Sequence, residues 1–107
     1  MSSPFGSVTR TRVLLALWLL ADSYPRELAR MLEVPLSTVQ KALVSLELDG
    51  LVAGRSVGRT RQFRLDPRYF AREALQQYLL RLAEPEDALR QRAAELRRRP
   101  RRTGKPL

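Results

Sequence analysis

The sequence predicts a mainly α-helical fold with one small β-hairpin, and three observations support this prediction. Apolar residues recur with helical spacing over most of the chain, as at Val39, Leu43 and Leu46. Segment 51–65 instead holds two short runs typical of strands, separated by a Gly-Arg turn. The length of 107 residues suits one hydrophobic core. We therefore expect one set of helices, with a hairpin beside them.

Two helices are expected in the N-terminal third of the chain. Ser7 can cap a first helix over 8–21, whose apolar side chains lie nearly all around it, as in a central core helix. Pro25 suits the first position of a short second helix ending at Leu32. The apolar run 13–21 also resembles part of a secretory signal, but it is far shorter than the roughly 20 residues that cross a bilayer. We interpret it as a buried helix.

A third helix is expected over 36–49, and Gly50 supplies its stop. The start of this helix is open. Ser37 and Gln40 fit a capping box, whereas Pro35 could instead occupy the first turn.

The hairpin is expected to pair a strand over 51–57 with a strand over 60–65. Phe63 and Leu65 then share the face toward the core, and Arg64 lies on the other face. The hairpin is strongly basic.

Two further helices are expected after the hairpin. Asp66 and Pro67 are expected to cap and start a fourth helix that ends near Ala83. Pro85 is expected to start a fifth, which has acids at its beginning and arginines at its end, a charge order that complements the helix dipole. The expected division of the chain is 1–66 for the helices with the hairpin, 67–99 for the C-terminal helices, and 100–107 for a basic flexible tail.

The composition excludes most enzyme and metal chemistries. The chain has no cysteine and no histidine, so it lacks disulfides, thiolate and imidazole metal ligands, cysteine nucleophiles and histidine bases. Its clustered carboxylates, Glu84, Glu86 and Asp87, lie at an expected helix start, where the dipole explains them. We expect no enzyme activity, no cofactor and no metal site.

The basic charge is concentrated in two patches. Lysine plus arginine number 20 against 11 acids, a net charge of +9. Segment 55–68 holds five arginines and one acid, and the segment from Arg90 onward holds eight basic residues and one acid. Like charges crowded on one hairpin repel each other, and an anionic partner offsets that repulsion. Because arginine forks suit phosphates, the predicted partner is a polyanion.

Three runs of residues carry a family resemblance: YPRELARML at 24–32, STVQKAL at 37–43 and LELDGLV at 46–52. With a helix before them and a basic hairpin after them, they resemble the winged helix-turn-helix transcriptional regulators of the ArsR/MarR-like superfamily. The resemblance implies a cytoplasmic, sequence-specific regulator that binds double-stranded DNA, with helix 36–49 in the major groove and 51–65 as a basic wing. Pro35 departs from the serine cap usual in the family, and the Cys and His ligands of ArsR-type metal sensors are absent.

The DNA-facing residues follow from helical geometry. If Val39 points inward, the opposite side of its helix points outward. There Gln40 suits adenine, Lys41 suits guanine or phosphate, and Val44 suits a thymine methyl, although a solvated face is the alternative for each. Leu48 is expected to pack against the hairpin instead. Wing arginines suit phosphates or a narrow minor groove. The DNA-binding candidates are Ser37, Thr38, Gln40, Lys41, Val44, Ser45, Arg55, Arg59, Arg61 and Arg64.

The resemblance also implies a homodimer, which would hold two recognition helices about one DNA turn, ~34 Å, apart. The apolar stripe of the fourth helix could be core, a seam with a second copy, or both. The candidate interface residues are Ala71, Leu75, Tyr78, Leu79 and Leu82. Two other functions stay open: a protein-interaction module whose basic tail docks an acidic partner, and RNA binding by the arginine-rich C-terminus.

Overall fold

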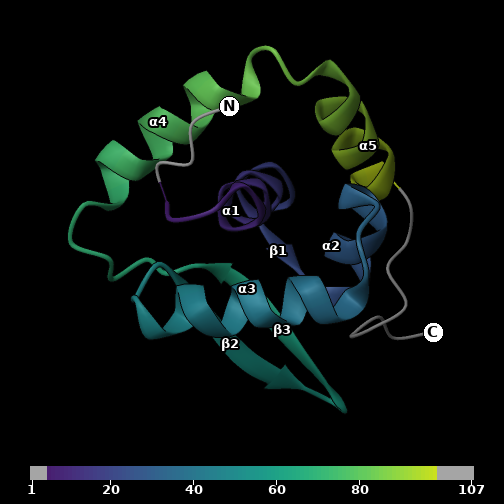
Figure 1. Cartoon of the computed structure of the whole chain (residues 1–107), viewed down its shortest axis with the longest axis vertical. Helices are drawn as coiled ribbons and strands as arrows, with labels where there is room; N and C mark the ends of the chain where they lie inside the picture. Colours follow the sequence, from purple (N-terminus) through teal and green to yellow (C-terminus); the bar gives the residue numbers. More distant parts are fainter. Residues whose placement is uncertain (1–4, 99–107) are drawn as a thin grey trace.

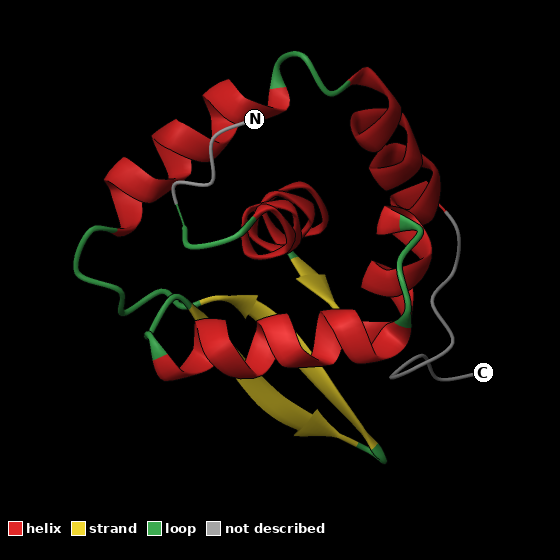
Figure 2. Cartoon of the chain, in the orientation of Figure 1, coloured by secondary structure: helices red, strands yellow, loops and turns green. Residues whose placement is uncertain are grey.

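The computed structural model describes residues 5–98 and consists of five helices and a small sheet (Figures 1 and 2). The helices are α1 (Val8–Leu20), α2 (Pro25–Leu32), α3 (Leu36–Leu48), α4 (Arg72–Ala83) and α5 (Asp87–Arg98). Figure 1 views α1 nearly end-on, with the other four helices arranged around it. The mainly helical fold with a β-hairpin is thereby confirmed.

Helix α1 is the centre of the core. The four consecutive residues 13–16 point in four directions around the helix, and each is at most 3% exposed, so this part of α1 is covered on all sides, as its apolar pattern predicts. Ser7 caps it, because its Oγ accepts the backbone N–H of Arg10 at 3.0 Å. Within residues 5–98, no helix has both the length and the apolar character needed to cross a membrane.

The α2–α3 pair forms as predicted, and the structure resolves the open start of α3. Pro35 is the N-cap residue, with an extended backbone and no side-chain cap, and its carbonyl oxygen accepts the N–H of Thr38 at 3.1 Å. Ser37 therefore lies in the first turn rather than at the cap. Gly50 follows the helix with a φ of 79°, the left-handed conformation that glycine adopts without strain.

The sheet has one strand more than the sequence predicts. Its strands are β1 (Asp22–Ser23), β2 (Val52–Val57) and β3 (Thr60–Leu65), in the antiparallel order β1-β3-β2. Strands β2 and β3 form the predicted hairpin. Strand β1 pairs Ser23 with Phe63. Two residues are too few to show strand alternation, and their partner lies far along the chain, so local patterns give no sign of β1.

The expected start of the fourth helix is wrong. Residues 66–71 form turns instead, and α4 begins only at Arg72. The Asp66 carboxylate accepts the backbone N–H of Arg68 at 2.9 Å, and the Asp66 carbonyl accepts that of Tyr69 at 3.1 Å. An aspartate side chain that bonds its own backbone two residues on stabilises a turn in competition with a helix. The fifth helix likewise begins at Asp87 rather than at Pro85.

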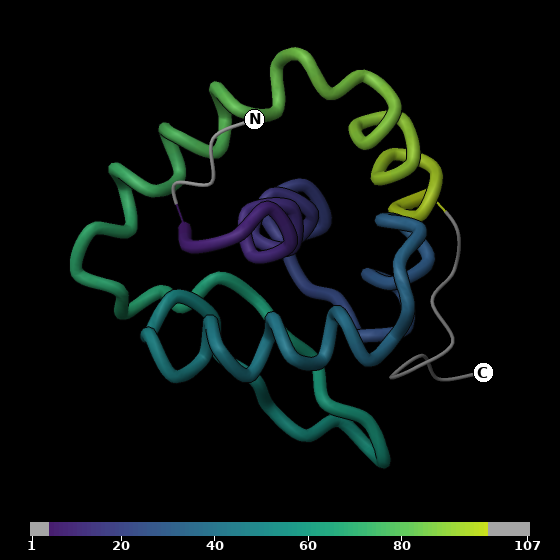
Figure 3. The backbone as a smooth tube through the Cα atoms, in the orientation of Figure 1, coloured from purple at the N-terminus to yellow at the C-terminus, as the bar shows by residue number. Residues whose placement is uncertain are grey.

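The N-terminal residues up to 66 and the C-terminal helices share one core, as the length of the chain predicts. Leu75 and Leu79 of α4 and Leu89 of α5 belong to the same buried cluster as the side chains of α1. Figure 3 shows the backbone of α4 and α5 curving around α1, and α5 contacts both α1 and α2. Segment 99–107, which includes the basic tail, lies outside the described residues.

Candidate nucleic-acid interface

The outer face of α3 is open to solvent, as helical geometry predicts. Val44 is 59% exposed, and Leu48 is 83% exposed rather than packed against the hairpin. Thr38 and Ser45, on the flanks, are half-buried. The side chains that line a shallow groove along this face are Ser37, Gln40, Lys41, Val44, Ser45 and Leu48.

Both acids at the C-terminal end of α3 are paired with arginines from other elements. Arg61 Nη2 lies 3.0 Å from Glu47 Oε2, and Arg10 Nη2 lies 2.7 Å from Asp49 Oδ2. The groove itself is lined by no carboxylate, and Lys41 provides its one formal charge. The face therefore presents amide, ammonium, hydroxyl and apolar groups without an unpaired anion.

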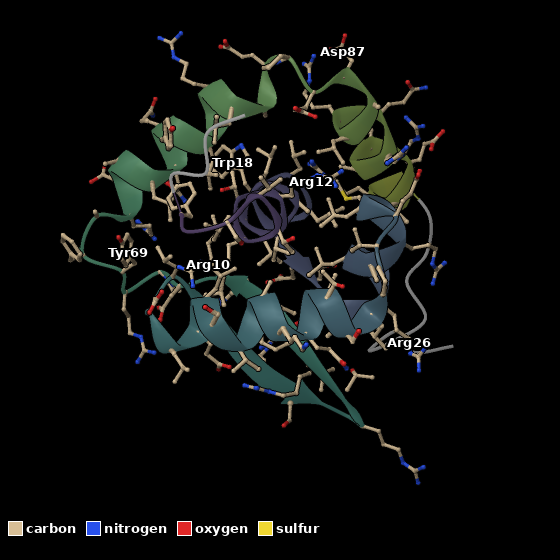
Figure 4. The ribbon with its side chains drawn as sticks, viewed as in Figure 1. Arg10, Arg12, Trp18, Arg26, Tyr69 and Asp87 are labelled. Carbon is tan, nitrogen blue, oxygen red and sulfur yellow. The ribbon has the colours of Figure 1, made fainter. Side chains whose placement is uncertain are left out.

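Arg10 holds the start of α1 against the end of α3. Figure 4 shows Arg10 between these two helices. Its guanidinium also donates to the Oγ of Ser45 and to the carbonyl of Phe5. The Ser45 hydroxyl is therefore engaged within the fold, and Ser45 acts as an anchor for Arg10 as well as a groove residue. Arg10 and Ser45 are 35 positions apart in the sequence, so no local pattern reveals this contact.

The four hairpin arginines are all exposed, but they differ in their contacts. Arg55 donates to Gln62 Oε1 from Nε at 3.2 Å and from Nη2 at 3.0 Å. Arg61 is engaged by Glu47. Within residues 5–98, neither Arg59, in the turn, nor Arg64 makes a side-chain hydrogen bond or ion pair, although the charge of Arg64 helps to lower the pKa of Asp66. These two guanidinium groups are the most available to an anion.

Arg26 is an exposed basic residue near the interface that the sequence analysis did not single out. It is the second residue of α2 and is exposed. Figure 4 shows it near the end of α3 that begins at Leu36. The first half of the chain is neutral overall, and that balance hides exposed arginines such as Arg26. The available signal is its position at the start of the helix that precedes α3.

The structure assigns two of the five candidate interface residues on α4 to the core, one of the uses that the sequence analysis left open. Leu75 is almost fully buried and Leu79 is 0% exposed, both within the core of this same chain. Tyr78 is partly exposed, and its ring lies against Phe5, with centroids 5.8 Å apart. Ala71 and Leu82 are half-buried. Because one helix face cannot be both core and surface, Leu75 and Leu79 are not available to a second copy.

Across residues 5–98, no group of three or more carboxylates is arranged to hold a metal ion.

No protein-family model matches this chain, and no curated protein is significantly similar to it.

Proposed function

We propose that this chain is a sequence-specific, double-stranded DNA-binding regulator of transcription, with α3 in the major groove and the β2–β3 hairpin on the adjacent backbone. One observation carries the proposal: the exposed face of α3 bears amide, ammonium, hydroxyl and apolar groups and no unpaired carboxylate, and it lies beside a hairpin whose Arg59 and Arg64 are exposed. The major groove admits an α-helix. Such a role requires access to chromosomal DNA and fits the expected cytoplasmic location.

The proposed division of labour separates base reading from positioning. Gln40 pairs with adenine, Lys41 with guanine or a phosphate, and Val44 meets a thymine methyl, since these are the pairings that major-groove geometry favours. Arg59 and Arg64 contact phosphates, which hold the protein in register without reading sequence. Val44 supports this role in particular, because 59% of it is open to solvent.

A homodimer would use the outward stripe of α4 rather than its buried one. Residues spaced three and four apart share a helix face, and this face is exposed from Glu73 through Gln77 to Arg81. Glu73 and Arg81 lie four residues on either side of Gln77. In an antiparallel pair centred on Gln77, each Glu73 would meet Arg81 of the second copy, and each Ala74 would meet Leu80. This self-complementarity supports a two-fold pair of DNA-reading helices.

The test is a selection from a pool of random-sequence DNA duplexes, followed by titration of the enriched duplex with fluorescence anisotropy. We expect one motif to be enriched and to bind more tightly than scrambled duplex, the single strand or an RNA duplex of the same sequence. Tighter binding to the RNA would favour the RNA-binding alternative. Failure to enrich any motif would contradict the proposal and favour a protein-interaction module.

A further inference from the structure

Arg61 is the hairpin arginine with the most contacts inside the fold. Its Nη2 and Nη1 lie 3.0 and 3.3 Å from the two carboxylate oxygens of Glu47, so the contact is bidentate and joins β3 to α3. Its guanidinium carbon also lies 5.0 Å from the centroid of the Phe63 ring on the same strand. Paired hydrogen bonds and a ring face together fix the direction of a guanidinium group much better than one contact does.

Gly54 makes room for this arrangement. It pairs with Phe63 across the hairpin. A Cβ atom at Gly54 would lie 2.5 Å from Nη2 of Arg61 and 2.8 Å from Cε2 of Phe63, so the Arg61 and Phe63 side chains would both have to shift, or the strand itself would have to move. The φ of Gly54 is not positive, unlike that of Gly58 in the turn. Space for the stacked guanidinium, rather than backbone conformation, therefore accounts for glycine at this position.

We propose that Arg61 is a positioning residue, which fixes the angle between the hairpin and α3 through Glu47 and Phe63 instead of contacting DNA. Its contacts lie two residues from Arg59 in the turn, so any rotation at this point is carried to the tip. The importance of that angle for DNA rests on the proposed function, whereas the effect on the hairpin of the free protein does not.

The sign of one substitution separates positioning from simple electrostatics. If Arg61 were only a phosphate contact, Glu47 would compete with the DNA for it, and Glu47→Gln would raise affinity. If the pair positions the wing, Glu47→Gln lowers affinity although it removes a negative charge near a polyanion. Asp49→Asn is the matched control, because Asp49 belongs to the same end of α3 but pairs with Arg10.

The first experiment uses the free protein and requires no DNA. The native chain has no cysteine, so Arg59→Cys with Gln91→Cys introduces two unique sites for spin labels, on the hairpin turn and on α5. We expect Glu47→Gln and the charge-neutral Gly54→Ala each to broaden or shift the electron-resonance distance distribution, and Asp49→Asn to leave it unchanged. Circular dichroism confirms that each variant is folded. An unchanged distribution in both test variants would overturn the inference.

The second experiment measures affinity for the selected duplex, without labels. Glu47→Gln is expected to weaken binding about two- to fivefold, the scale of a partly exposed ion pair, and Asp49→Asn is expected not to weaken it. Arg61→Lys should weaken binding like Arg61→Ala, because lysine keeps the charge but loses the bidentate fork. Tighter binding by Glu47→Gln, or full rescue by lysine, would overturn the positioning role. If the wild type binds no duplex, the proposed function fails while the spin-label result still decides the inference.

Discussion

Helix α5 and the β2–β3 hairpin carry four arginines each in segments of similar length, and the two sets have different surroundings. On α5, Arg92 Nη1 donates to the carbonyl of Met31 at 2.8 Å, and Arg97 Nη1 donates to that of Leu19 at 2.8 Å. These carbonyls lie at the C-terminal ends of α2 and α1. Arginine at a helix C-terminus satisfies free carbonyls and complements the dipole.

The hairpin arginines make fewer contacts with the rest of the fold. Arg61 reaches α3, and Arg55 bonds its cross-strand neighbour Gln62. Arg59 and Arg64 face solvent. The comparison teaches that local charge density does not distinguish an arginine that the fold engages from one that is left open to solvent. What distinguishes them is the presence of a carbonyl or carboxylate within reach, and that is a property of the tertiary fold.

The largest expected effect concerns α4, where buried and solvent-exposed residues differ in the same way as the two sets of arginines. Leu79→Ala removes a fully buried side chain and should lower the free energy of unfolding by about 2–5 kcal/mol in a urea titration. The next residue, Leu80, is 46% exposed and should tolerate Leu80→Glu with little change in stability. The same Leu80→Glu should shift a dimer toward monomer in sedimentation velocity. Equal losses of stability in the two variants would contradict the assignment of the faces.

The next effect concerns base reading by α3. Gln40→Ala should cost about 1–3 kcal/mol of binding free energy on the preferred duplex and little on scrambled DNA, because only a base contact depends on sequence. Gln91→Ala on α5 is the matched control, since Gln91 is also an exposed helical glutamine. A competition titration measures both. Unchanged site preference in Gln40→Ala would show that the outward face of α3 has been assigned the wrong role.

A smaller effect tests the two sets of arginines directly. Arg92→Ala removes an ion pair to Glu33, 2.6 Å long, and a bond to a helix carbonyl, and should lower stability by about 1 kcal/mol without changing DNA affinity. Arg59→Ala should leave stability unchanged and lower the affinity for DNA. Binding to all duplexes should weaken similarly, because phosphate contacts carry no sequence information. Thermal denaturation and anisotropy on both variants check this. If Arg92→Ala lowered DNA affinity and Arg59→Ala did not, the roles assigned to the α5 and hairpin arginines would be wrong.

The smallest effect is a pH dependence at the end of the hairpin. The backbone N–H of Arg68, together with its side chain, holds the pKa of Asp66 below the ordinary 3.8. Because the folded pKa is lower than the unfolded one, Asp66 stabilises the fold above about pH 4, and that stability is lost as pH falls through the folded pKa. Stability of the wild type relative to Asp66→Asn should therefore shrink in urea titrations between about pH 5 and pH 2. A stability difference between the two proteins that does not change with pH would contradict a lowered pKa of Asp66 in the folded state.

Features encoded by neighbouring residues could be predicted from the sequence. The Ser7 cap, Pro25 at a helix start and the Val39 stripe predict α1, α2 and α3, and the orientation of Val39 is enough to predict that Val44 is exposed. The turn at Asp66 was missed, because aspartate before proline also fits a helix start, and the competing bond to Arg68 depends on backbone geometry.

Features that depend on distant residues could not be predicted. Strand β1 exists only through its pairing with β3. Arg61 and Ser45 could be identified as interface candidates, but their structural contacts require Glu47 and Arg10 to be brought alongside by the fold. On α4, Leu79 and Tyr78 follow each other in the sequence, and only the position of α1 decides which one is buried.

The most direct test of the central claim, that α3 and the hairpin bind duplex DNA through exposed cations, is the salt dependence of affinity for the selected duplex. The exposed cations Arg55, Arg59, Arg64, Lys41 and Arg26 could supply about six to ten phosphate contacts per dimer, so affinity should fall by ~10³- to 10⁵-fold between about 50 and 200 mM salt. Arg59→Ala should flatten the slope of log affinity against log salt, whereas Arg92→Ala should leave it unchanged. Affinity that does not vary with salt, or a slope insensitive to Arg59, would contradict the account.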